Sequence, residues 1–313
     1  MKRSALLFAV LACCAGAASS DAPKRPRIIG IGGATILASE ISDARTFYRS
    51  VLDPDRSCNF CEEIPSSTLF LLGGQHITLE KSSAANLSSR LAEISFRVDD
   101  LQKLGKFLKA NGVAFEEMKT KGKGVQSGAR IGLLVHDPEG HNISFVGPPE
   151  LFSSASVAPD SSGTIQQSLS LLHLIHAGFI VRDRAATEHF YKDILGFRPY
   201  WHGGMKDDQT DWVSMQVPDG TDWLEFMVNV GPDPDQRLRG IMNHIAIGVP
   251  DIHAAEKKLQ ENSIKLTEEP KIGRDGKWQL NVYDPDLTRI EFMEFTPVQK
   301  PCCSEFTGPH PKP

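Results

Sequence analysis

Two histidines and two glutamates occur at matched spacing in the second half of the sequence. Glu225 follows His176 by 49 residues, and Glu291 follows His244 by 47 residues. Two imidazoles with one or two carboxylates suit a divalent ion such as Zn, Ni, Mn or Fe(II) and leave positions open for substrate oxygens. A single histidine in an apolar strand is usually a hydrogen-bonded core residue, but the repeated spacing favours ligands. We therefore predict a metal site made of His176, Glu225, His244 and Glu291.

These residues belong to a repeated pattern of a strand followed by a helix. An apolar stretch at His176 leads to Asp183 and then to an amphipathic segment that ends at Gly196, and His244 leads in the same way to Asp251. In both copies the aspartate stands seven residues after the histidine, where it would begin a helix. Weaker copies begin near residues 30 and 91, and each of the four ends in a turn and a short strand. The spacing predicts four βαβββ units.

The pattern resembles the vicinal oxygen chelate superfamily, which includes glyoxalase I, extradiol dioxygenases and bleomycin resistance proteins. The residues that carry the resemblance are 176–197, 244–259 and 284–292. It implies an α+β fold in which four βαβββ modules pair into two cup-shaped mixed-sheet domains with helices outside. It also implies metal ligands on the first and last strands of each unit, facing the cup.

The first half lacks this set of ligands. Gly33, Glu80, Glu93 and Ser144 stand at the matching positions, and no imidazole is among them. We expect a domain that is structural or that binds something without a metal. Strand alternation also places His173 on the sheet face opposite to the metal, which makes it a weaker ligand candidate.

Composition shifts divide the chain into segments. Residues 1–20 have a basic start, an apolar stretch and small residues near position 17, which predicts a signal peptide and a periplasmic or secreted protein; a lipoprotein anchor at Cys13 is the less favoured alternative. We expect a degenerate domain over 28–149, a Ser-rich linker over 150–170, the metal-binding domain over 171–297 and an irregular tail over 298–313. No other segment is predicted to span a membrane.

Composition also bounds the function. The hydrophobic content of 40% and the charged content of 23% are ordinary for a globular chain, and the formal net charge of −5 disfavours a nucleic-acid binder. We expect a small-molecule substrate as the partner, while the oligomeric state stays open. Four cysteines remain after export, Cys58, Cys61, Cys302 and Cys303, and they are compatible with disulfides or with free thiols.

Three functions fit this pattern. The main hypothesis is a lyase or isomerase resembling glyoxalase I, in which all four residues bind the metal while Glu291 or Glu225 moves a proton. The second is a ring-cleaving dioxygenase with Fe(II) held by His176, His244 and Glu291, although Asn281 stands where the extradiol signature has a tyrosine. The third is a non-catalytic protein that sequesters a small molecule. Trp223 shares a strand face with Glu225, which predicts an aromatic wall beside the site.

Overall fold

A computed structural model describes most of the chain, namely residues 22–52, 63–64, 66–72, 74–84, 87–119, 130–147 and 172–313. The predicted signal peptide, the predicted linker and Cys13, Cys58 and Cys61 lie outside the described residues. Among the described residues, no helix has the length and apolar character needed to cross a membrane.

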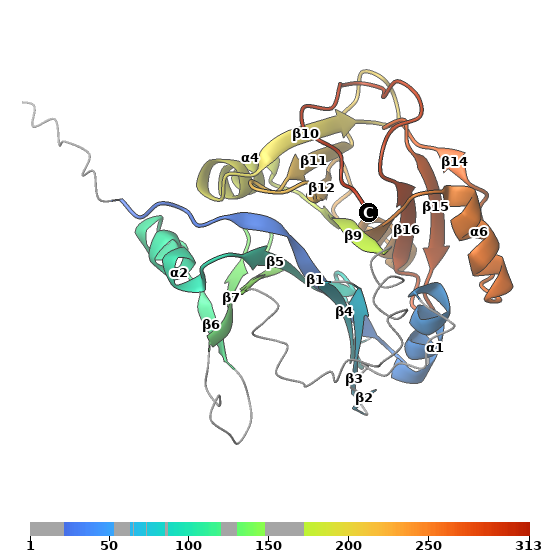
Figure 1. The fold of residues 1–313 in the computed structure, drawn as a ribbon, viewed down its shortest axis with the longest axis horizontal. Helices are drawn as coiled ribbons and strands as arrows, with labels where there is room; N and C mark the ends of the chain where they lie inside the picture. The colour runs from blue at the N-terminus through green and yellow to red at the C-terminus, as the bar shows by residue number, and fades with distance from the viewer. Residues whose placement is uncertain are drawn as a thin grey trace, which may run out of the picture.

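The first half forms an eight-stranded mixed sheet with two helices (Figure 1). Its elements are β1 (Ile28–Ala38), α1 (Ile41–Leu52), β2 (Glu63–Ile64), β3 (Ser67–Leu72), β4 (Gln75–Lys81), β5 (Leu91–Val98), α2 (Leu101–Ala110), β6 (Glu116–Lys119), β7 (Arg130–His136) and β8 (Asn142–Val146). The strand order is β2-β3-β4-β1-β5-β8-β7-β6. The first strands of two units, β1 and β5, therefore lie side by side at the centre.

The second half repeats this arrangement. Its elements are β9 (His173–Ile180), α4 (Arg184–Glu188), the π-helical turn η3 (His189–Ile194), β10 (Arg198–Gly203), β11 (Trp212–Gln216), β12 (Trp223–Met227), α5 (Gln236–Met242), β13 (His244–Val249), α6 (Ile252–Glu261), β14 (Lys271–Ile272), β15 (Trp278–Tyr283) and β16 (Arg289–Glu294). The strand order, β10-β11-β12-β9-β13-β16-β15-β14, matches that of the first sheet unit by unit. The predicted fold of four modules paired into two curled mixed sheets is confirmed.

The helices begin at the aspartates that the sequence pattern singled out. The side chain of Asp183 accepts a hydrogen bond from the Ala186 amide at 2.9 Å, and Asp251 accepts one from the Ala254 amide at 3.0 Å. Each carboxylate satisfies an amide that has no partner within the helix, and its charge lies at the positive end of the helix dipole. The apolar strand and the capped helix that follows it thus form one repeated unit.

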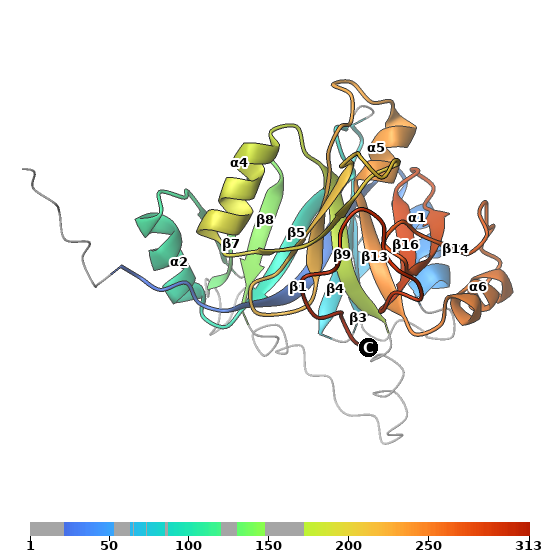
Figure 2. The ribbon, with the colours of Figure 1, turned by 90° about the horizontal axis from the view of Figure 1, so that it is seen from above.

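Buried tyrosines join the two halves of the chain. Tyr48 on α1 donates to Asp284 at 3.3 Å, and Tyr191 on η3 donates to Asp137 at 3.1 Å. Each tyrosine comes from one sheet's helix layer and reaches a turn of the other sheet. Burial and the neighbouring carboxylate both raise the pKa of Tyr48 and of Tyr191, so the two phenols stay protonated donors. Figure 2 shows the result, with α2 and α4 on one flank and α1 and α6 on the other.

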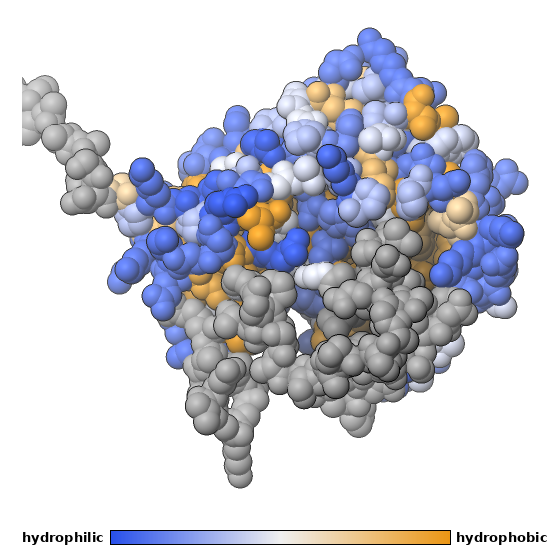
Figure 3. Space-filling model, in the orientation of Figure 1, coloured by the Kyte–Doolittle hydropathy of each residue, from blue (hydrophilic) through white to orange (hydrophobic). Residues whose placement is uncertain are grey.

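One apolar core is shared by both sheets. Phe96 of the first sheet and Phe197 of the second pack edge to face with their ring centroids 5.3 Å apart, and both belong to a single cluster of buried side chains. On the face drawn in Figure 3, hydrophilic residues are the more numerous among the coloured ones, with apolar patches between them. The large apolar side chains that are exposed among the described residues are Met205, Leu287 and Val298.

This shared core leads to a prediction about the linker. Limited proteolysis is expected to cut first between Phe152 and Ser170, and the two fragments should then stay associated because separation would expose the common core to water. Native gel filtration compared with a denaturing gel measures this. Fragments that separate after cleavage, or early cleavage within residues 171–297, would contradict the prediction.

The tail, residues 298–313, contains no helix or strand but packs against the second sheet. The Phe306 ring lies 4.8 Å from the Tyr200 ring, and the Tyr200 hydroxyl lies 2.6 Å from His310 Nδ1. The neighbouring residues Cys302 and Cys303 form a disulfide. The tail thus covers part of the cup of the second sheet.

Candidate metal centre

The four predicted ligands come from the four central strands of the second sheet. β9 and β13 are antiparallel neighbours, and each has the last strand of its own unit on its other side, β12 and β16 respectively. In this register His244 and Glu225 both stand opposite Gly178, while His176 and Glu291 both stand opposite Ala246. Residues opposite one another share a sheet face, so the topology places all four side chains in the cup.

The side chains converge on one point. The Nε2 atoms of His176 and His244 lie 3.1 Å apart, and Glu291 Oε2 lies 3.5 Å from each of them. Glu225 Oε2 lies 3.5 Å from His244 Nε2. Both histidines are fully buried, and the side chains of Glu291 and Glu225 are 4% and 14% exposed.

These distances fit the ligand shell of a divalent ion. Donors bonded to one ion at about 2.0–2.2 Å lie about 3.0–3.5 Å apart in octahedral or tetrahedral geometry. Ligand atoms of His176, Glu225 and His244 all lie within 4.8 Å of one another, whereas Glu291 is close to the two imidazoles. The geometry therefore accommodates a site of three or of four residues.

The protonation states also suit a metal. Burial lowers the pKa of His244 well below its usual value, and the nearby Arg289 and His176 lower it further, so the ring is neutral. Its Nδ1 lies 3.3 Å from the Met242 carbonyl, to which it donates, and this leaves the Nε2 lone pair facing the site. Burial alone would raise the pKa of Glu291, but Arg289 and the two imidazoles hold it below its usual value as a carboxylate.

Arg289 is a site residue that the sequence analysis did not single out. Its guanidinium lies 2.8 Å from His244 Nε2 and 3.9 Å from Glu291 Oε2. Because one lone pair serves one partner, a metal on His244 requires the guanidinium to withdraw from that nitrogen. Arg289 stands two residues before Glu291 on β16, so strand alternation carried the signal that both face the cup.

The predicted sheet face of His173 is wrong. The pairing of β9 with β13 shifts by one residue between His176 and Leu174, so Ile175 is a bulge and the alternation of faces is interrupted there. His173 consequently lies on the cup side, where its ring is 6.3 Å from that of Phe295. Burial would lower the pKa of His173, but its 2.8 Å contact with Asp222 outweighs burial and raises it. His173 is thus engaged by a carboxylate and is not one of the four converging ligands.

The corresponding strands of the first sheet carry no histidine at the positions of the four predicted ligands. One of the positions predicted to correspond to a ligand needs correction. Glu225 stands opposite Gly178, and the equivalent pairing in the first sheet is Thr78 opposite Thr35, so Thr78 and not Glu80 matches Glu225. The matching position cannot be found by counting residues from the turn before the last strand, because this turn differs in length between the units. Glu93 accepts a 2.6 Å hydrogen bond from Ser144, and burial raises the pKa of this carboxyl.

Among the described residues, one other cluster brings possible ligand atoms together, namely Asp207 with Cys302 and Cys303. Asp207 is exposed and the two sulfurs are bonded to each other, so this cluster lacks the thiolates that a metal would need.

Comparison with known proteins agrees with this architecture. Residues 173–292 match the family model described as the Glyoxalase/Bleomycin resistance protein/Dioxygenase superfamily. The matched segment contains all four predicted ligands and most of the second sheet, so this part of the chain is similar to that superfamily. No curated protein sequence matches the chain.

Solved structures extend the likeness to both halves. A variant of homoprotocatechuate 2,3-dioxygenase from B. fuscum, in complex with HPCA, has a TM-score of 0.62 and 20% identity over 92% of this chain and 74% of that one. The homoprotocatechuate 2,3-dioxygenase from Arthrobacter globiformis has a TM-score of 0.60 and 20% identity over 86% of this chain and 80% of that one. At this identity the likeness establishes the fold.

Proposed function

We propose that the protein is a divalent-metal enzyme that acts on a small substrate through two neighbouring oxygen atoms, and that its reaction is ring cleavage by an Fe(II) dioxygenase. The observation that carries this proposal is the convergence of His176, His244 and Glu291 within 3.1–3.5 Å in a buried cup. The likeness to dioxygenases over both halves supports the reaction class. Export of the protein stays a prediction.

A bound divalent ion would supply the Lewis acid that holds and polarises the two oxygens. The chain's own residues shape the rest of the site. Trp223 stacks against His176 with a centroid separation of 4.7 Å, so it fixes the imidazole and forms an aromatic wall. Glu225 Oε2 lies 3.5 Å from His244 Nε2, so its side chain reaches the place where a substrate would bind. If Glu225 does not bind the metal, it can accept a proton from that substrate.

Asn281 bears on which residue transfers protons in the proposed reaction. It stands opposite Glu291 on β15, at the position where the extradiol signature has a tyrosine. Its amide donates to Glu268 at 3.1 Å, and Tyr283 donates to the same carboxylate at 2.8 Å. An amide has no acidic proton, so Glu225 is the residue that we assign to proton transfer.

A second candidate function is a lyase or isomerase resembling glyoxalase I. The specific observation that favours it is Glu225 Oε2 at 3.5 Å from His244 Nε2, which would complete a four-residue site. Metal analysis of the purified protein, together with assays on catechols and on hemithioacetals, separates the two reactions. A protein that binds metal and turns over neither substrate would support the sequestering alternative.

Two glutamate variants decide how many residues bind the ion. In a three-residue site, Glu291→Gln should lose metal, because it removes a charged ligand. Glu225→Gln should keep metal and lose about 10²- to 10⁴-fold in kcat, because it removes the proton acceptor. In a four-residue site both variants should lose metal. Metal content after dialysis and steady-state kinetics measure these effects.

The control is Glu269→Gln, which removes an exposed carboxylate of the same half and should change neither quantity. Full metal content and full activity in both Glu225→Gln and Glu291→Gln would contradict the assignment of the site.

A further inference from the structure

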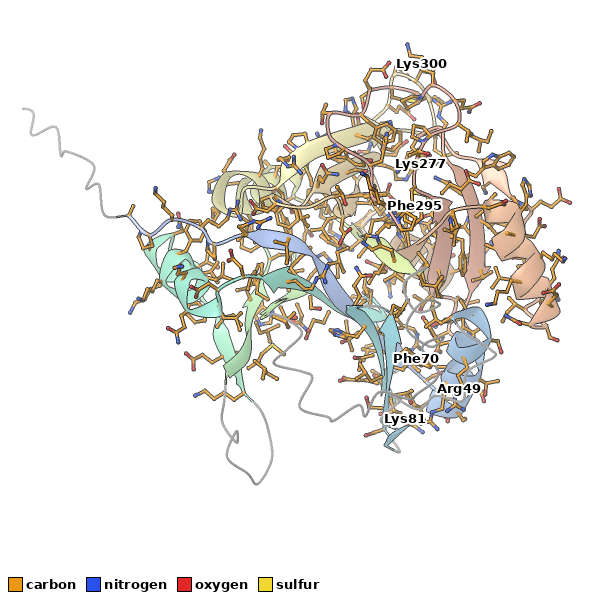
Figure 4. All side chains as sticks on the ribbon, viewed as in Figure 1. Arg49, Phe70, Lys81, Lys277, Phe295 and Lys300 are labelled. Carbon is orange, nitrogen blue, oxygen red and sulfur yellow. A yellow bond between two sulfur atoms is a disulfide. The ribbon has the colours of Figure 1, made fainter. Side chains whose placement is uncertain are left out.

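A buried lysine lies beside the metal centre without a hydrogen-bond partner. Lys277 is fully buried, and no partner for its Nζ exists among the described residues. Three aromatic rings surround the ammonium group, with centroids 4.6 Å away for Trp223, 5.2 Å for Phe306 and 5.7 Å for Tyr200. In Figure 4, Lys277 lies between β10 and β15 of the second sheet.

The position is unfavourable for a purely structural residue. An ammonium group that leaves water without gaining hydrogen bonds destabilises the fold, and the attraction of aromatic faces offsets only part of that cost. Methionine has a similar length and would pack between the same three rings without a charge. The Lys277 charge therefore points to a partner that arrives from outside the protein.

The surrounding charges indicate the sign and place of that partner. Trp223 contacts both Lys277 and His176. Burial lowers the pKa of Lys277 to about 8, and the carboxylates of Asp275, Glu291 and Glu225 offset part of that lowering. The ammonium group thus lies in the same cup as the predicted ligands. Its three hydrogen-bond donors have no acceptor there until a ligand supplies one.

A charge count supports an anionic ligand. The charged side chains considered are those of Glu225, Asp275, Glu291, Lys277 and Arg289, although burial raises the pKa of Asp275 to about 6 and lowers that of Lys277 to about 8. Three carboxylates against two cations leave one negative charge, so these side chains together attract a cation. A divalent ion reverses the balance to one positive charge, which an anionic ligand would neutralise in a low-dielectric cup.

We propose that Lys277 binds an anionic oxygen of the substrate beside the metal. This inference rests on the proposed metal-dependent function. The anionic oxygen has two possible sources, an ionised hydroxyl of the metal-bound pair or a separate carboxylate of the same molecule. Phe306 comes from the tail, so the aromatic enclosure of Lys277 is complete only when the tail is in place.

The test measures the binding of three probes to metal-loaded protein. Catechol carries only the vicinal oxygens, 3,4-dihydroxybenzoate adds a carboxylate, and 4-methylcatechol adds an uncharged group instead. All three chelate a divalent ion whichever reaction the enzyme performs. Lys277→Met should keep the metal and the melting temperature, or raise the latter, because it removes an unpaired buried charge.

The expected loss is in probe affinity. If Lys277 meets a carboxylate, the variant should bind 3,4-dihydroxybenzoate about 10- to 100-fold more weakly and the other two probes as wild type does. If it meets an ionised hydroxyl, all three affinities should fall by a similar factor. The matched control is Lys300→Met. The Lys300 side chain lies on the tail and is 83% exposed, so this variant should leave every affinity unchanged.

Three results would overturn the proposal. Unchanged affinity for all three probes in metal-loaded Lys277→Met would show that the ammonium group meets no ligand. Loss of metal together with probe binding would assign Lys277 a structural role, as would failure of both Lys277→Met and Lys277→Gln to fold. The metal content of the wild type is measured first, because a protein that binds no divalent ion contradicts the proposed function and this inference together.

Discussion

His176→Ala and His244→Ala should each lose the metal and the activity together. Removing one imidazole from three or four ligands leaves too few donors to hold a divalent ion against water, so the affinity should fall by more than about 100-fold. Metal content after dialysis and titration calorimetry with the added ion measure the loss. Folding should survive, because the core consists of apolar strand residues of both sheets.

The matched control is His189→Ala, which removes an exposed imidazole that is paired with Asp193 on η3. It should keep wild-type metal content and activity. Stoichiometric metal in a variant that lacks both His176 and His244 would contradict the site, and so would a wild type that binds no divalent ion.

Much of the fold, and the convergence of the four candidate ligands, could be predicted from the sequence because the unit repeats. Asp183 and Asp251 mark the helix starts of the third and fourth units. In each of these units a histidine marks the first strand, and a glutamate nearly fifty residues later marks the last strand. In the structure these two strands are parallel neighbours, and two such pairs meet at the centre of the sheet. The spacing was therefore sufficient to predict that the four side chains lie in one cup.

Local irregularities were not predictable from the same pattern. The bulge at Ile175 reverses the face of His173, and a turn of different length moves the matching position from Glu80 to Thr78. One extra residue in a strand leaves composition and periodicity almost unchanged but moves every side chain before it to the other face.

The charged residues around the site depend on contacts between distant segments. Lys277 is enclosed by rings from β10, β12 and the tail, which lie far from it in sequence. No local pattern marks a lysine as buried, since lysine is almost always exposed. Arg289 carried a local signal in its alternation with Glu291, but its contact with His244 joins two strands.

Gly178→Ala should abolish metal binding almost as fully as loss of His244 itself. A Cβ atom at position 178 would lie 2.0 Å from Cε1 and 2.5 Å from Nδ1 of the His244 ring. The ring lies opposite Gly178 across two paired strands and is fully buried, so it can relieve the overlap only by leaving its position or by moving the backbone. Either movement takes Nε2 away from the other ligands.

We expect the free energy of unfolding to fall by about 1–3 kcal/mol, in the range of overpacked cores, and metal affinity to fall by more than about 100-fold. Chemical denaturation of the metal-free protein and calorimetry with the added ion measure the two effects separately. The control is Gly231→Ala, where an added Cβ meets no atom within 4 Å. The pseudo-equivalent position opposite His176 already holds Ala246, so the two sides of the site differ in how closely ring and backbone approach. Wild-type metal affinity in Gly178→Ala would show that the His244 ring can hold the ion from another position, and the ligand geometry assigned to this strand pair would then be wrong.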